Sequence, residues 1–388
     1  MAKKKKFETI AIHTGNAPDP VTGSISPAIH LTSTFAQDGI GKNKGYDYSR
    51  GGNPTRARLE KNIAALEGGC DAIAFASGMA ATTALFQGLQ QGDHVIVSRN
   101  VYGGTYRMVT QVLRHHGIDF EFVDTRDVEN IKQTIKPETK WVFIETPTNP
   151  MLEITDIQAV SAICNQSGVK LAVDNTFMSS YGQRPLEYGA DCVMHSSTKF
   201  IGGHSDVLGG ILVAKDEDLA KRLHFIQKSG GAVPSPFDSW LLLRSVKTMS
   251  MRVQKASDNA MVLANFFESH DKITKTIYPG LSSHPQHEVA KQQQINPHGD
   301  ILFGSIISVV FESKDTLDSF LSHIKLFSLA ESLGGVESLM SVPYFMTHAD
   351  VPKDVKAEMD LVPELLRLAV GIEHIDDLIS DIEAALVK

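Results

Sequence analysis

The chain has 388 residues, of which 42% are hydrophobic and 21% are charged, as in a globular protein large enough for more than one domain. Its 37 basic and 45 acidic residues give a net charge of -8, which argues against a nucleic-acid partner held through phosphates. Three widely spaced cysteines argue against a disulfide framework and a zinc–thiolate site. No apolar run reaches the length of a membrane helix, so we expect a cytoplasmic protein without membrane contact.

Residues 1–52 mix Pro, Gly, Ser and Thr without sustained periodicity, and this predicts an extended N-terminal arm. A helix start follows, with Asn53 as the N-cap and Pro54 in the first helical position. Leu59 and Leu66 belong to the apolar face of this helix, and the pair of glycines that follows predicts its end.

From residue 53 to residue 247, short apolar runs alternate with longer helical patterns. This alternation predicts an α/β domain with a mostly parallel central sheet and helices on both faces. The expected strands lie at residues 72–76, 94–97, 141–144, 170–173, 192–194 and 211–214. Ligands of such folds bind beyond the carboxyl ends of the strands, so we look for chemistry there.

Residues 248–388 have a different pattern. A long amphipathic stretch at 249–269 is followed by mixed segments, and the chain closes with a strand at 366–370 and a helix at 377–387. This predicts a second, smaller α+β domain. No internal repeat is present.

Polar residues follow several of the predicted strands. Ser77 and Gly78 follow the first, where a glycine lets the N–H groups of a helix start converge on an anion. Asp174 and Lys199 follow two later strands. Each residue alone is explained by an ordinary turn, a capping carboxylate or a surface charge. Together they match the amine, the acidic partner and the phosphate donors that pyridoxal phosphate requires.

Residues 191–205 read DCVMHSSTKFIGGHS, and this segment resembles the lysine signature of the Cys/Met-metabolism family of pyridoxal-phosphate enzymes. Further matches lie at residues 48–50, 52–56, 102–105, 145–150, 174–176, 330–339 and 367–373. The ordered set covers almost the whole chain. The resemblance implies fold type I, the PLP-dependent transferase-like fold, and pyridoxal 5′-phosphate as the cofactor.

The resemblance also implies a role for individual residues. Lys199 holds the cofactor and acts as general base, Asp174 pairs with the ring nitrogen, and Tyr102 stacks on the ring near the leaving group. The phosphate is assigned to Gly78, Met79, Ser196 and Thr198, with Tyr48 and Arg50 from a neighbouring subunit, and the substrate carboxylate to Arg367, Asn149 and Ser332. Such enzymes are homotetramers built from two dimers.

Glu331, which precedes the sequence Ser-Leu-Gly-Gly, resembles the pattern of γ-lyases and γ-synthases and would meet the distal amino group of cystathionine. We therefore expect a carbon–sulfur lyase of transsulfuration that cleaves cystathionine to cysteine, 2-oxobutanoate and ammonia. Two related reactions stay open. One is cystathionine γ-synthase, which uses an activated homoserine ester and cysteine, and the other is cystathionine β-lyase.

Other classes of function have less support. A dinucleotide-binding module needs the spacing G-x-G-x-x-G, which residues 76–80 lack. A catalytically inert interaction protein would not need Lys199, Asp174 and Arg367 together. His284 and His287 have a metal-like spacing, but Pro285 between them indicates a loop, so we expect no metal site.

Overall fold

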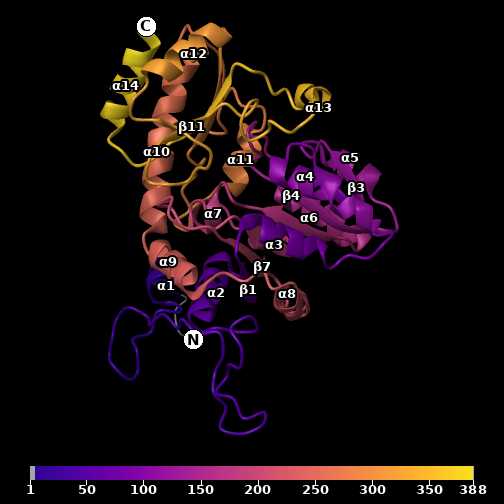
Figure 1. The fold of residues 1–388 in the computed structure, drawn as a ribbon. Coiled ribbons are helices and arrows are strands. Elements are labelled where there is room, and N and C mark those ends of the chain that lie inside the picture. The colour runs from indigo at the N-terminus through magenta and orange to yellow at the C-terminus, as the bar shows by residue number, and fades with distance from the viewer. Residues whose placement is uncertain (1–4, 388) are drawn as a thin grey trace.

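The computed structural model describes residues 5–387, so residues 1–4 of the expected arm lie outside the described part. Two β-sheets organise it (Figure 1). The large sheet has the strand order β1-β7-β6-β5-β4-β2-β3. Its strands are β1 (Asp71–Phe75), β2 (His94–Ser98), β3 (Asp119–Val123), β4 (Thr139–Glu145), β5 (Lys170–Asp174), β6 (Cys192–His195) and β7 (Gly210–Ala214).

The strands from β6 to β3 pair in parallel, and only β7 runs antiparallel to its neighbours β1 and β6. Buried side chains of α2, α5 and α6 pack on one face of the sheet, and those of α3, α4 and α8 pack on the other. The bounds of these helices are Pro54–Glu67, Val128–Thr134 and Ile157–Ser167, then Gly78–Phe86, Gly103–Gln111 and Glu217–Gly230. The predicted mostly parallel sheet with helices on both faces is confirmed.

The small sheet has the order β10-β11-β12-β9-β8 and packs on α10, α12 and α14. Its strands are β8 (Ile273–Ile277), β9 (Ile306–Phe311), β10 (Ser328–Leu329), β11 (Leu339–Ser341) and β12 (Leu365–Ala369). The remaining helices are α7 (Ser179–Gly182), α9 (Pro236–Val246), α10 (Met249–Glu268), α11 (His287–Gln293), α12 (Lys314–His323), α13 (Lys353–Glu358) and α14 (Ile375–Val387), with 3₁₀ turns at Leu113–His116 and Pro185–Tyr188. We propose a domain boundary near residue 247, between α9 and α10.

The start of the arm differs from the expectation of an extended segment, because residues Phe7–His13 form the helix α1. Phe7 and Ala11 are buried, and Asn62 of α2 donates hydrogen bonds to the carbonyls of Ala11 (3.0 Å) and Thr14 (2.7 Å). A helix of seven residues is too short to show a periodic pattern, so tertiary packing rather than propensity stabilises it. The rest of the arm, drawn in indigo, runs in turns and extended segments along the bottom of Figure 1.

The predicted ends of α2 are confirmed. The Asn53 side chain accepts hydrogen bonds from the backbone nitrogens of Thr55 and Arg56, and Gly68 has a φ of +77°, a left-handed conformation that favours glycine. The edge strand β3 was missing from the prediction, since its sequence alternates polar and apolar residues instead of forming an apolar run. Within residues 5–387, no helix is long and apolar enough to cross a bilayer.

Candidate active site

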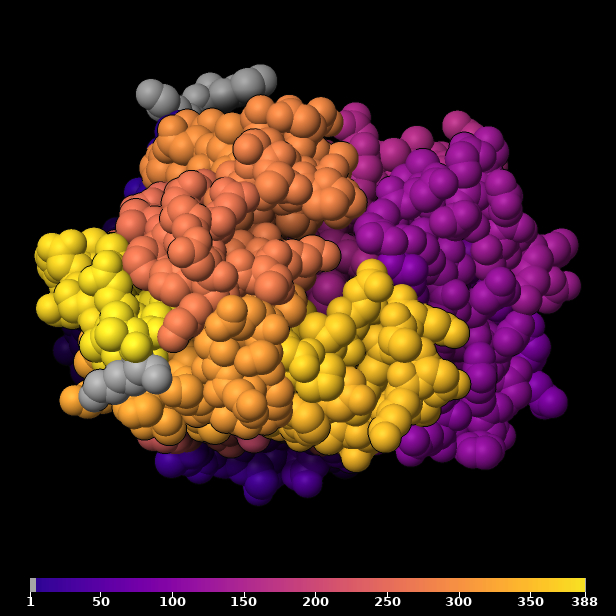
Figure 2. Space-filling view, turned by 90° about the horizontal axis from the view of Figure 1, so that it is seen from above, coloured from indigo at the N-terminus to yellow at the C-terminus, as the bar shows by residue number. Residues whose placement is uncertain are grey.

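A cavity of about 230 Å³ lies at the carboxyl ends of the large-sheet strands, where β12 and loops of the C-terminal part close over it. Figure 2 shows the orange and yellow C-terminal residues lying against the purple residues of the part of the chain that contains the large sheet. The predicted site residues in its lining are Gly78, Met79, Tyr102, Asn149, Asp174, Ser196, Thr198, Lys199, Glu331, Ser332 and Arg367. The two sheets together therefore bring eleven of the thirteen predicted positions to one cavity.

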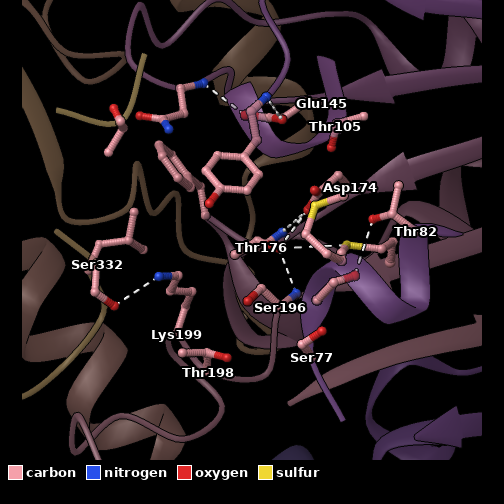
Figure 3. Close-up of a pocket in the computed structure, with 18 of the residues that line it drawn as sticks. Ser77, Thr82, Thr105, Glu145, Asp174, Thr176, Ser196, Thr198, Lys199 and Ser332 are labelled. Carbon is pink, nitrogen blue, oxygen red and sulfur yellow. Dashed lines mark hydrogen bonds between the residues drawn. The ribbon is translucent and has the colours of Figure 1, made fainter. Parts of the chain in front are cut away.

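Lys199 lies in the turn that follows β6. Its Nζ donates a hydrogen bond of 2.8 Å to Oγ of Ser332, and Figure 3 shows the two side chains facing each other. Burial and the positive charge of Arg367 lower the pKa of Lys199 to about 8, and the negative charge of Glu331 offsets only part of this lowering. The amine is therefore half neutral near pH 8, as a nucleophile or a general base requires.

Asp174 and Glu145 are two buried carboxyl groups at the ends of neighbouring strands. Asp174 accepts hydrogen bonds from the backbone nitrogen (3.0 Å) and the hydroxyl (2.6 Å) of Thr176. Burial raises the pKa of Asp174 in spite of these bonds, and burial together with the charge of Asp174 raises the pKa of Glu145 well above its ordinary value. A carboxylate in this position is stabilised by a cationic partner in the cavity, such as a protonated ring nitrogen.

Glu145 is the first residue of the motif at residues 145–150, but the family resemblance assigns it no role. Its two oxygens accept hydrogen bonds from the backbone nitrogens of Tyr102 (2.8 Å) and Asn149 (2.9 Å), so it fixes the start of α4 relative to the loop after β4. The signal that would have found it is its place at the end of β4, beside Asp174 at the end of β5.

The side of the cavity opposite the large sheet is built around Arg367, which is buried in β12. Its Nη1 donates to Oδ1 of Asn149 (2.9 Å) and its Nη2 to the carbonyl of Ser332 (2.8 Å), while Nε has no partner within residues 5–387. Ser332 has a φ of +87°, a conformation uncommon for serine. This geometry lets one residue meet Lys199 through its hydroxyl and Arg367 through its carbonyl.

The start of α3 has the features of an anion site. Ser77 caps this helix by accepting a hydrogen bond of 3.1 Å from the nitrogen of Ala80. A Cβ atom on Gly78 would lie 2.8 Å from Cβ of Ser196, so only glycine lets the turn approach this closely. A helix N-terminus with converging N–H groups and nearby hydroxyls suits a phosphate.

Tyr48 and Arg50 are outside the lining of the cavity. They lie on the arm, where the Arg50 guanidinium is 5.5 Å from the centre of the Tyr48 ring and donates to the carbonyl of Lys228. His284 and His287 hydrogen-bond to backbone carbonyls, and no cluster of His, Cys, Asp and Glu suited to a metal ion is found among residues 5–387.

The family model described as Cys/Met metabolism PLP-dependent enzyme matches residues 8–387. The chain belongs to this family. It is 47% identical to cystathionine γ-lyase of Bacillus subtilis (98% of this chain and 99% of the relative) and 45% identical to cystathionine β-lyase of Lactococcus lactis subsp. cremoris (98% and 99%). A structure of cystathionine γ-synthase from Xanthomonas oryzae pv. oryzae, in complex with aminoacrylate and cysteine, superposes with a TM-score of 0.96 at 37% identity (99% of this chain, 98% of that chain).

The enzyme is thus PLP-dependent and has fold type I, as the resemblance implied. The cavity fits the cofactor by the chemistry of its residues. It holds an amine of lowered pKa, a buried carboxyl group that a cation would stabilise, and an anion site at a helix start. The relatives carry three different activities at similar identity, so they do not decide the reaction.

The lowered pKa of Lys199 predicts how the cofactor-free enzyme reacts with PLP. Below the pKa the amine is protonated and unreactive, so the rate of attachment rises with pH through about 8 and then levels off. In Arg367→Leu the positive neighbour is lost, and the midpoint moves to higher pH. The rate of appearance of the cofactor's visible absorption, followed against pH, measures both midpoints. A wild-type midpoint near the ordinary lysine value of 10.5 would contradict the expectation.

Proposed function

We propose that this enzyme is a cystathionine γ-lyase, which cleaves cystathionine to cysteine, 2-oxobutanoate and ammonia. The observation that carries the proposal is the place of Glu331 in the cavity lining, close enough to Lys199 and Arg367 for its charge to offset part of the lowering that burial causes in the pKa of both. Cystathionine has an amino acid at each end. A carboxylate at Glu331 provides a partner for the distal amino group while Arg367 holds the α-carboxylate at the reacting end.

The residues of the cavity have complementary roles in this reaction. We propose that Asp174 faces the ring nitrogen of PLP and that the anion site at the start of α3 holds its phosphate. When bound, PLP stabilises the negative charge that develops on the substrate Cα. The Arg367 guanidinium orients the substrate through two-point contact with its carboxylate, supported by Asn149 and Ser332.

Proton transfer is assigned to two side chains. Neutral Lys199 takes the proton from the substrate Cα, and the hydroxyl of Ser332 holds the lysine amine in place when it is free. Tyr102, anchored through its backbone nitrogen to Glu145, lies in the lining and transfers a proton near the departing sulfur.

Cystathionine γ-synthase is the second candidate, because cystathionine is its product and Glu331 would fit it equally well. That reaction requires a cation for the distal carboxylate of a succinyl ester. Arg107 could supply one, but it pairs with Asp350 at 3.0 Å and lies outside the lining of the cavity. This pairing favours the lyase.

Product analysis with purified holoenzyme separates the candidates. Cystathionine that yields cysteine and 2-oxobutanoate supports γ-lyase, whereas homocysteine and pyruvate would identify a β-lyase. Formation of cystathionine from an activated homoserine and cysteine, with negligible cleavage, would identify a synthase and overturn the proposal.

Glu331→Gln tests the specificity argument. Loss of the carboxylate removes one charge-assisted hydrogen bond, so the KM for cystathionine rises about tenfold with little change in kcat. The KM for a homoserine-type substrate without a distal amino group stays unchanged. Glu337→Gln, an exposed residue of the same loop with a single long bond to Ser205, serves as the matched control. An equal rise for both substrates would show that Glu331 acts on the loop and not on the distal amine.

We also propose a homotetramer built from two dimers, in which Tyr48 and Arg50 complete the phosphate site of the neighbouring subunit. The arm leaves both residues outside the cavity of their own chain and exposes the apolar side chains of Val21, Ile25 and Ile40. An exposed apolar arm of this kind is suited to a subunit interface.

Hybrid dimers test the shared site. Arg50→Leu and Lys199→Ala are each expected to have low activity, but a mixed dimer contains one cavity with both native residues. Co-expression of the two variants therefore restores about a quarter of the wild-type activity if the subunits pair randomly. Mixed dimers no more active than the parent variants would show that Arg50 does not act across the interface.

A further inference from the structure

A buried pair of titratable side chains lies behind the cavity and has no role in the reaction described above. Glu67 is the last residue of α2, and His195 is the last residue of β6. Both side chains are buried, and Oε1 of Glu67 lies 2.5 Å from Nε2 of His195. Oε2 of Glu67 has no hydrogen-bond partner within residues 5–387. Because a buried carboxylate is costly unless a charge or hydrogen bond compensates it, this pair requires an explanation.

The backbone connects the pair directly to Asp174. In the register of β5 and β6, Asp174 lies opposite Met194, the residue before His195. On the other side of His195, the backbone nitrogen of Ser196 donates to Oγ1 of Thr176 (2.9 Å), whose hydroxyl donates to Oδ1 of Asp174 (2.6 Å). Figure 3 shows these last two bonds meeting at Thr176. A displacement of His195 would therefore move the groups that orient the Asp174 carboxyl.

The charges of the Glu67–His195 pair, like its backbone contacts, affect the Asp174 carboxyl. Two titratable groups lie near the Asp174 carboxyl on the neighbouring strands, Glu145 on β4 and His195 on β6. His195 in turn pairs with Glu67 of α2. Burial makes a negative charge on Asp174 costly and raises its pKa, whereas the positive charge of His195 acts to lower it. The Glu67 carboxylate in turn stabilises the protonated imidazole.

We propose that Glu67 and His195 form a positioning pair that keeps Asp174 ionised and oriented toward the cavity. This inference rests on the proposed function, in which Asp174 keeps the ring nitrogen of the cofactor protonated. Without a cationic His195, the Asp174 carboxylate becomes more basic and takes the proton from the ring nitrogen.

The test uses holoenzyme reconstituted with PLP that carries ¹⁵N at the ring nitrogen, because the ¹⁵N chemical shift reports whether that nitrogen is protonated. In the wild type the signal is that of a protonated ring. In Glu67→Gln and in His195→Gln the signal moves toward the unprotonated value. The ratio of molecules with the proton on the ring nitrogen to those with the proton on Asp174 falls about tenfold, which equals a change of one unit in the difference between the two pKa values. A protonated signal in both variants overturns the inference.

Two further variants make the outcome specific. Glu60→Gln alters another buried glutamate of α2, which accepts a hydrogen bond of 3.0 Å from the nitrogen of Ala74, and it leaves the ¹⁵N signal at the wild-type position. A shift in this control equal to that of Glu67→Gln would overturn the inference by showing a general effect of the helix.

Asp174→Asn tests the proposed function. An unprotonated wild-type ring, or a signal that Asp174→Asn leaves unchanged, means that the role of Asp174 fails. A shift in Asp174→Asn with none in the pair variants means that the pair proposal alone fails.

Discussion

Replacing Lys199 with alanine is expected to lower kcat by about 10⁴-fold, the upper end of the range for a positioned acid or base. In the proposed function, the variant loses both the amine that attaches the cofactor and the base that takes the Cα proton. Among residues 5–387 the hydrogen-bond partner of Nζ is the hydroxyl of Ser332, which is too weak a base to replace the amine. Steady-state kinetics with cystathionine measure the loss.

The same variant should still bind PLP. Asp174 and the anion site at the start of α3 are intact, so the cofactor associates without a covalent bond and is removed by gel filtration, whereas it stays with the wild type. Lys199→Arg serves as the control for charge, since a guanidinium keeps the positive charge but is not deprotonated near neutral pH. A Lys199→Ala variant that retains a hundredth of the wild-type kcat would contradict the assignment.

Arg367→Leu is expected to raise the KM for cystathionine by about 10²- to 10³-fold, because the proposed clamp on the substrate carboxylate loses two charge-assisted hydrogen bonds. The guanidinium is buried and held by Asn149 and by the carbonyl of Ser332, so the clamp is formed before substrate binds. Arg367→Lys recovers only part of the loss, since an ammonium lacks the two-point geometry.

Binding of simple ligands separates this role from a general disturbance of the cavity. In Arg367→Leu, the affinity for L-alanine falls by a similar factor, while the affinity for ethylamine, which has no carboxylate, is unchanged. Absorbance changes of the bound cofactor report both affinities. An equal loss for the two ligands would show that Arg367 maintains the cavity and does not grip the carboxylate.

The part of the site formed by the large sheet could be predicted from residues alone. Ser77, Asp174 and Lys199 follow strands of one mostly parallel sheet, and the carboxyl ends of such strands meet at one edge. Arg367 and Ser332 came only from the family resemblance. Arg367 lies in β12 and Ser332 in the loop between β10 and β11, both more than a hundred residues further along the chain, and no local pattern indicates that this part of the chain closes over the large sheet.

Other features left too weak a local signal. The helix α1 depends on contacts with Asn62, and the strand β3 is an edge strand with two of its five residues exposed. The Glu67–His195 pair joins residues 128 positions apart, so the place of His195 in the motif at residues 191–205 does not indicate its partner in the sequence.

The most direct test of the account is to find which residue carries the cofactor. Reduction of the holoenzyme with borohydride fixes PLP permanently to the lysine that holds it, and digestion followed by mass spectrometry locates the modified peptide. The account predicts the modification at Lys199, and its loss in Lys199→Ala. Modification at any other lysine, or equal labelling in the Lys199→Ala variant, would contradict the central claim that the amine facing Ser332 in this cavity binds the cofactor.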